Sequence, residues 1–283
     1  METGINSFFN NSFVRIIIIV LIAILLHYLS SKIIGYLIRF FVQREKSQTL
    51  ADAKKREDTL IGLGSTLTKI IIWAIAIFAI LDVFKFNIAS VMAGAGVVGI
   101  VVGLGAQTTI RDYLAGIFIL LENQYRVGDV ITLSGGSVGV GTSGVVEEIT
   151  LRITKIRDLD GALNVVRNGE ANVITNLTFE YSSVVIDVGV DYASDIDNVE
   201  KIMNKVGKDM LKDQELAPSI KEPISFLRVS DFTDNSVVVK VIGKVKPAKQ
   251  WEIAGEYRRR LLKAFNEAGI EIAFPQVVVH QKK

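Results

Sequence analysis

The sequence predicts an α-helical membrane region with three spans per chain, followed by an all-β domain and an α+β domain. Three long apolar stretches occupy the first part of the chain, up to about residue 126. Short alternating segments replace them from Val127, and helical and strand patterns alternate after Tyr181. A mean hydropathy of +0.38 beside 22% charged residues fits such a division into an apolar part and a soluble part.

The first apolar stretch is Phe13–Leu26, and its apolar character continues with interruptions to Val42. A helix of about 30 residues is ~45 Å long, which is enough to cross a bilayer. Lys32 and Arg39 are seven positions apart on one helical face, where long cations reach the membrane interface. A secretory signal peptide is the alternative, although no small-residue cleavage site follows the apolar core.

The second apolar stretch is Leu60–Phe84, and the third begins at Ile88. The connection between the first two is rich in Lys and Arg, whereas the next turn carries only Lys85. The positive-inside rule therefore places the first connection in the cytoplasm. We expect a multi-pass protein of the inner or plasma membrane, with residues 1–87 holding the first two spans. The N-terminus would lie outside and the C-terminal domains in the cytoplasm.

The third stretch contains Ser90–Gly105, which is uncharged and rich in glycine. Small residues allow membrane helices to approach one another closely. Gly94–Gly99 also matches the G-x-G-x-x-G pattern of dinucleotide sites, but that site needs a preceding strand and an acidic residue about 20 positions later. Here the first acidic residue is Asp112, and the preceding stretch is a predicted span. We therefore expect no cofactor.

A helical wheel divides this stretch into distinct faces. Ala93, Ile100, Leu104 and Gln107 share one face; Gly99 and Gly103 form one flank, and Val97 and Val101 form the other. Val98 and Val102 point away from these faces, toward lipid or another helix. In a ring of identical helices, the valine ridge of one copy can enter the glycine groove of the next. The apolar face would then point at the ring axis and form a constriction that closes by dewetting. A glycine-rich helix packed inside a single-chain bundle is the alternative.

Gln107, Thr108 and Thr109 interrupt the apolar run before a second helical pattern, Ile110–Leu121. Polar residues between two helical stretches favour a bend, after which the second half lies along the membrane surface. We therefore expect residues 88–126 to form a helix bent near 107–109. One continuous helix is the alternative.

Residues 127–180 are predicted to form the β domain, as a small antiparallel barrel or sandwich. The predicted strands are Asp129–Leu133, Gly144–Ile149, Leu151–Arg157 and Leu163–Val166. Residues 181–270 follow a β-α-β-β-α-β order that is typical of a ferredoxin-like α/β domain. Its elements are predicted at Val184–Val190, Asp195–Leu211, Ile224–Val229, Ser236–Lys246, Lys249–Ala268 and, within the final segment 271–283, Val277–His280.

Composition excludes several functional classes. The chain has no cysteine, and its two histidines, His27 and His280, lie near opposite ends, so we expect neither a catalytic triad nor a metal site. The carboxylate pairs lie beside glycine in turns or strands, where a solvating role is typical. A net charge of +2 does not indicate a nucleic-acid partner. We expect no enzyme activity.

Several short motifs together resemble the small-conductance mechanosensitive channels (MscS-like). They are the Gln107 break, Tyr125-Arg-Val-Gly-Asp-Val130, Asp160-Gly161, Asn168-Gly169 and Asn176-Leu177. The resemblance covers about 60–283. It implies a homoheptamer in membrane lipid, with the third span lining the pore above a cage of Sm-like β barrels and α/β domains. The C-terminal strands would form a small barrel at the base of the cage.

The resemblance also implies a function: opening by membrane tension and release of ions and small osmolytes on hypo-osmotic shock. The gate of the family maps onto Ile100 and Leu104, and its bend onto Gln107 and Thr108. Three positions depart from the family pattern. Thr108 stands where glycine is frequent, Val97 and Val101 where alanine is common, and Arg167 where proline is expected. The alternative function is a membrane-anchored module whose β domain binds RNA or protein.

Overall fold

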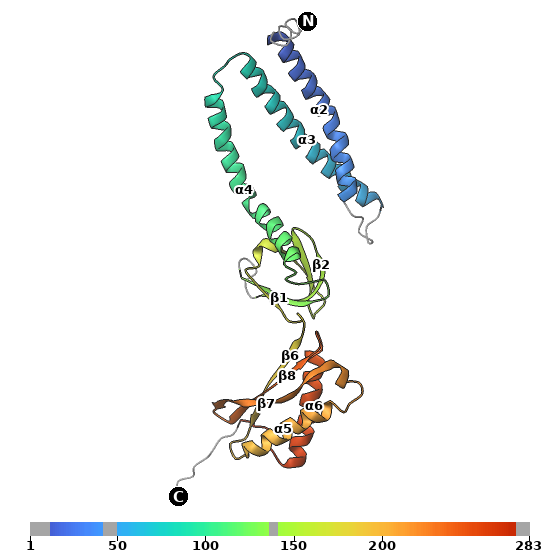
Figure 1. Ribbon diagram of the computed structural model, residues 1–283, viewed down its shortest axis with the longest axis vertical. Coiled ribbons are helices and arrows are strands. Elements are labelled where there is room, and N and C mark those ends of the chain that lie inside the picture. Colours follow the sequence, from blue (N-terminus) through green and yellow to red (C-terminus); the bar gives the residue numbers. More distant parts are fainter. Residues whose placement is uncertain (1–11, 42–49, 136–140, 276–283) are drawn as a thin grey trace, which may run out of the picture. The chain divides into compact units, whose positions relative to one another are not determined.

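The computed structural model describes residues 12–41, 50–135 and 141–275 (Figure 1). The chain divides into two compact units, Met1–Gly105 and Ala106–Lys283, which are described one at a time. The predicted tip of the first hairpin, at 136–140, and the predicted last strand, Val277–His280, lie outside the described residues.

The described part of the chain begins with three long helices, as predicted: α2 (Ser12–Phe41), α3 (Leu50–Val83) and α4 (Ala89–Leu121). Each contains a segment that is long and apolar enough to cross a membrane. These segments are Ser12–Arg39, Lys54–Val83 and Ala89–Leu121. The glycine-rich stretch Ser90–Gly105 is therefore helical throughout, although glycine costs about 1 kcal/mol relative to alanine inside a helix.

α2 and α3 lie side by side (Figure 1) and pack through small residues. Ala23 and Ala76 are buried, and a Cβ added to Gly64 would lie 3.1 Å from the Ile34 side chain. The Trp73 indole donates a hydrogen bond to His27 Nδ1 at 3.2 Å. Close approach at small residues is the usual way in which membrane helices associate.

The β domain is one antiparallel sheet in the order β4-β3-β2-β1-β5. Its strands are β1 (Val130–Ser134), β2 (Thr142–Ile149), β3 (Ile153–Arg157), β4 (Leu163–Arg167) and β5 (Val173–Asn176). The four predicted strands are confirmed within a few residues, and β5 is an addition. Alternate residues of β1 and β3 point into the core, with Ile131, Leu133 and Ile156 buried.

The C-terminal domain has the split arrangement that the sequence predicts. It contains β6 (Ser182–Val190), α5 (Ile196–Met210), β7 (Ile220–Thr233), β8 (Ser236–Val245) and α6 (Gln250–Ala268). β8 lies between β6 and β7 and is antiparallel to both, so β6 and β7 are parallel. Beyond β6, Ile272 forms an antiparallel bridge with Val190, at the edge where a fourth strand belongs.

Both helices of this domain contribute to one core and have defined ends. Met203 and Met210 of α5 and Tyr257 and Phe265 of α6 are fully buried with residues of the sheet. Asp195 caps α5 by accepting a hydrogen bond from the Asp197 amide. The core therefore fixes the position of α6 independently of the membrane helices.

A pH-dependent contribution to stability arises on α6 at Glu256. Its carboxylate accepts hydrogen bonds from Arg259 and Arg260, which lower its pKa from 4.5 to about 2. A depressed carboxyl pKa adds stability above the unfolded value, and that stability is lost as the pH falls toward the folded value. We expect the unfolding temperature of the purified chain to fall between pH 4.5 and about 2, and Glu256→Gln to reduce this fall. An identical pH profile for the variant would contradict the assignment.

Candidate pore helix and its attachment to the β domain

The first half of α4 is exposed and is not covered by any other described part of the chain. Every residue from 89 to 105 is exposed. A Cβ added at Gly94, Gly99 or Gly103 would meet no atom within 4 Å. The alternative of a glycine-rich helix buried in a single-chain bundle is therefore wrong for this structure. An apolar helix with open grooves calls for lipid or further copies of the chain as its neighbours.

The predicted gate and packing residues all lie on this exposed half. Ile100 and Leu104 are one helical turn apart, and their side chains are 66% and 67% exposed. Val97 and Val101 are similarly exposed, as are the positions of Gly99 and Gly103. Because α4 is helical over all of these positions, the faces that the wheel assigns apply to it. The contacts between copies that it predicts remain a prediction.

The predicted bend at Gln107 and Thr108 lies inside an unbroken α-helix, since α4 runs from Ala89 to Leu121 without a change of helix type. The boundary between the two compact units falls between Gly105 and Ala106, directly before these residues. The environment of the helix also changes here, from a run of exposed residues to a regular pattern of buried ones. A bend of the axis at this point stays a prediction.

The second half of α4 is attached to the β domain through one face. Asp112, Gly116 and Ile119 are its buried residues, spaced at four and three positions. Ile119 joins the core of the β domain. A Cβ at Gly116 would lie 2.0 Å from the Leu151 carbonyl oxygen, so only glycine permits this close approach of helix and loop. This segment of α4 therefore packs as part of the β domain.

A buried polar network centred on Asn168 supports this attachment. The Asn168 amide group donates to the Thr150 carbonyl oxygen and accepts from the Thr154 hydroxyl, at 2.9 and 2.8 Å. The Tyr125 hydroxyl, just after α4, lies 2.8 Å from the same Thr154 hydroxyl oxygen. Burial raises the pKa of Tyr125, so the phenol keeps its proton. Buried polar groups that are all paired in this way hold one geometry.

Asp112 is the residue of α4 that packs against Arg152 and Gly169 of the β domain. Its carboxyl group is almost completely buried, and Arg152 Nε lies 3.9 Å from Asp112 Oδ2. A Cβ at Gly169 would lie 2.6 Å from Asp112 Oδ1, so this position also requires glycine. Sequence reasoning recognised Asn168-Gly169 as a motif but missed Asp112 and Gly116. A glycine in the middle of a predicted helix was the available signal.

Comparison with known proteins agrees with this architecture. Three family models match successive parts of the chain. They are mechanosensitive ion channel transmembrane helices 2/3 at residues 66–107, the mechanosensitive ion channel β-domain at 108–179, and the MscS C-terminal domain at 184–272. Together they follow the order of membrane helices, β domain and α+β domain seen here.

Individual relatives extend the match over nearly the whole chain. A small-conductance mechanosensitive channel of Caldanaerobacter subterraneus is 29% identical over 95% of this chain and 93% of its own length. The MscS family protein YfkC of Bacillus subtilis is 32% identical over 78% of this chain and 74% of its own length. The closed-state crystal structure of Helicobacter pylori MscS aligns with a TM-score of 0.65, at 22% identity, over 94% of this chain and 98% of that one.

Three helices that can cross a membrane, followed by a β domain and an α+β domain, are the architecture of the mechanosensitive channels that the comparisons match. The chain belongs to the MscS family of mechanosensitive ion channels. This family consists of channels and not enzymes. The family membership replaces the alternative of a membrane-anchored module that binds RNA or protein.

Proposed function

We propose that copies of this chain form a ring in which the first half of each α4 lines a central pore. The observation that carries the proposal is that every residue from 89 to 105 is exposed, with open space at the glycines. The ridge of Val97 and Val101 would enter the groove of Gly99 and Gly103 on the next copy. The resemblance to the family implies seven copies.

Ile100 and Leu104 are the proposed gate of this pore. They face the ring axis when the two flanks pack, and two rings of apolar side chains at small radius exclude water and ions. Membrane tension favours a state of larger area in the membrane plane, and a stimulus shifts an equilibrium through such a difference between the states. The open channel would release ions and small osmolytes when the cell swells in hypo-osmotic shock.

The attachment of the second half of α4 to the β domain indicates where a hinge of the pore helix would lie. Asp112, Gly116 and Asn168 hold residues 106–121 to the β domain as one body. Gln107 and Thr108 lie at the start of that body and are the proposed hinge between it and the pore-lining half. We also propose that the connection at 42–49 is cytoplasmic, with the N-terminus outside, because Arg39 and Lys54–Arg56 flank it.

Disulfide trapping tests the proposed ring. Because the sequence contains no cysteine, any disulfide must form between introduced residues. The double variant Val101→Cys/Gly103→Cys is expected to give covalent oligomers after mild oxidation, because one ridge cysteine and one groove cysteine meet at each contact. Disulfides form only when Cα atoms lie within about 7 Å. The measurement is a non-reducing gel of membranes from cells that express the full chain.

The matched control is Val98→Cys/Val102→Cys, on the face that the wheel directs away from the axis and the flanks. It should stay monomeric on the gel, as should either single variant of the first pair. A ladder from the control that equals the ladder from the ridge and groove pair would contradict the assigned faces.

A further inference from the structure

A polar contact within the membrane region joins His27 of α2 to Trp73 of α3. The Trp73 indole N–H donates a hydrogen bond to His27 Nδ1 at 3.2 Å, and the two rings meet edge to face with centroids 6.4 Å apart. Because the indole nitrogen can only donate, His27 Nδ1 must accept and carries no proton. The proton of the imidazole is then on Nε2. This contact therefore requires the neutral form of His27.

The charged groups that face His27 are cationic. A cavity of about 590 Å³ lies beside the contact, and its titratable groups besides His27 are Tyr28 and Lys32 of α2 and Lys69 of α3. None of the described residues that line it is acidic. Lys32 and Lys69 form no ion pair within the described part of the chain. The spans themselves add no carboxylate, because α2 contains no Asp or Glu and Lys69 is the only charged residue of α3 between 60 and 81.

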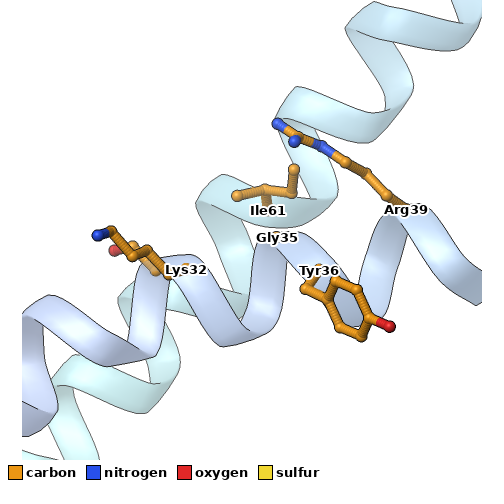
Figure 2. A pocket seen from close by; sticks show the side chains of 6 residues that line it. Lys32, Gly35, Tyr36, Arg39 and Ile61 are labelled. Carbon is orange, nitrogen blue, oxygen red and sulfur yellow. The ribbon is translucent and has the colours of Figure 1, made fainter.

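The rest of the contact between α2 and α3 is made largely by small residues. Ala23 and Ala76 are buried. Figure 2 shows the contact about two turns beyond His27, where Gly35 lies beside Ile61 of α3. A Cβ at Gly35 would lie 3.9 Å from the Ile61 Cδ1 atom. Small side chains bury little apolar area, so a hydrogen bond between these helices contributes proportionally more than it would among large residues.

We propose that His27 is an acid-sensitive switch in the contact between α2 and α3. In acid, Nδ1 takes up one proton from water, two N–H donors then face each other, and the hydrogen bond from Trp73 is lost. The new positive charge lies beside Lys32 and Lys69 without a carboxylate to receive it, and an unpaired charge in a membrane span is unfavourable. The imidazolium turns toward water, and the two helices separate at this level.

A weaker contact between α2 and α3 makes it easier for these helices to spread in the membrane plane. Tension favours the state of larger in-plane area, so acid lowers the tension at which the channel opens. This consequence rests on the proposed function, whereas the switch itself rests on the contact of His27 with Trp73. Histidine is the side chain that ordinarily changes charge between about pH 5 and 8, and the chain has two, His27 and His280. His280 therefore provides the control.

The nuclear magnetic resonance signal of the Trp73 indole nitrogen tests the switch without applied tension. The chain has two tryptophans, and the second, Trp251, lies on α6 outside the spans. Full-length Trp251→Phe, labelled with ¹⁵N-tryptophan in liposomes, therefore gives the Trp73 signal alone. We expect this signal to move between about pH 8 and about pH 5, as the hydrogen bond is lost.

Two histidine variants identify the group that titrates. In the Trp251→Phe protein, His27→Gln should hold the indole signal at one position at both pH values, because the amide oxygen accepts the same bond and does not titrate. His280→Gln should show the same shift as the starting protein. An unchanged signal in the starting protein, or an equal shift in His27→Gln, would overturn the proposal.

A second label keeps the test decisive if His27→Gln does not assemble on size exclusion. In His280→Gln, His27 is the only histidine, so ¹⁵N-histidine reports its Nδ1 directly. The Nδ1 signal and the indole signal should change over the same pH range. A change of one without the other would contradict the coupling of His27 to Trp73.

Recordings from liposome patches measure the consequence for gating. The suction threshold of the wild type is expected to be lower at about pH 5 than at about pH 8. His27→Gln should have the same threshold at both, and His280→Gln should behave as the wild type. A pH-dependent indole signal with a pH-independent threshold would overturn the link to gating. Absence of current at either pH would contradict the proposed function instead, and the indole signal would still decide the switch.

Discussion

Leu104→Ser is expected to give a channel that leaks at rest or opens at much lower tension than the wild type. Leu104 is one of the two residues proposed to close the pore, and it is 67% exposed, so the substitution removes little packing within the described part of the chain. Each replacement lowers the free-energy cost of filling the constriction with water by roughly 1.5–3 kcal/mol. Repeated around a ring of several copies, the change reaches on the order of 10 kcal/mol. Current in patched liposomes, recorded against applied suction, measures the effect.

Val102→Ser is the matched control for this prediction. It also replaces an exposed apolar residue of the same helix by serine, but the wheel directs Val102 away from the ring axis. We expect its tension threshold to stay near that of the wild type. If Leu104→Ser keeps the wild-type threshold, or if Val102→Ser leaks equally, Leu104 is not part of the gate.

Gly116→Ala is expected to loosen the attachment of α4 to the β domain. The added Cβ would lie 2.0 Å from the Leu151 carbonyl oxygen and 2.6 Å from Asn168 Nδ2. Because the first of these atoms is backbone, the helix or the loop must move. Overpacking of this kind costs about 1–3 kcal/mol, which corresponds to an unfolding temperature roughly 3–10 °C lower. Thermal unfolding of the purified full chain in detergent measures the loss.

Gly255→Ala controls for the change from glycine to alanine within a helix. Gly255 lies on the exposed side of α6, where a Cβ meets no atom within 4 Å. This substitution should leave the unfolding temperature unchanged or raise it slightly, since alanine favours the helix by up to about 1 kcal/mol. Equal unfolding temperatures for the two variants would show that the contact at Gly116 does not hold α4.

Apolar periodicity was sufficient to predict the fold because each element repeats a simple local pattern. The three spans and both helices of the C-terminal domain have the expected type. The bounds of α3 differ, because it begins at Leu50, in a charged segment that precedes the predicted apolar stretch Leu60–Phe84. β5 was missed because Val173–Asn176 has only four residues and gains its strand geometry from pairing with β1, about 40 positions earlier. β7 is longer than predicted, and its register shifts between Glu222 and Ser225, around Pro223.

The candidate site also contains residues that a local sequence pattern predicts and residues that only the fold brings together. Ile100 and Leu104 follow from one helix and its wheel, because the pattern that selects them is local. The contact between Asp112 and Gly169 joins residues 57 positions apart, and no local sequence pattern in either segment predicts it. In the sequence, Asp112 looks like half of a charged pair with Arg111, whereas the structure buries it against the turn at Asn168-Gly169. Long-range contacts of this kind come only from the fold.

The central claim is that a ring of exposed α4 helices forms a pore closed by Ile100 and Leu104 and opened by tension. The most direct measurement is the current across patches of liposomes that contain only the purified wild-type chain, under increasing suction. The account predicts stepwise currents above a threshold suction, absent in protein-free liposomes and shifted to lower suction by Leu104→Ser. Patches that rupture without any current, despite verified incorporation of the oligomer, would contradict it.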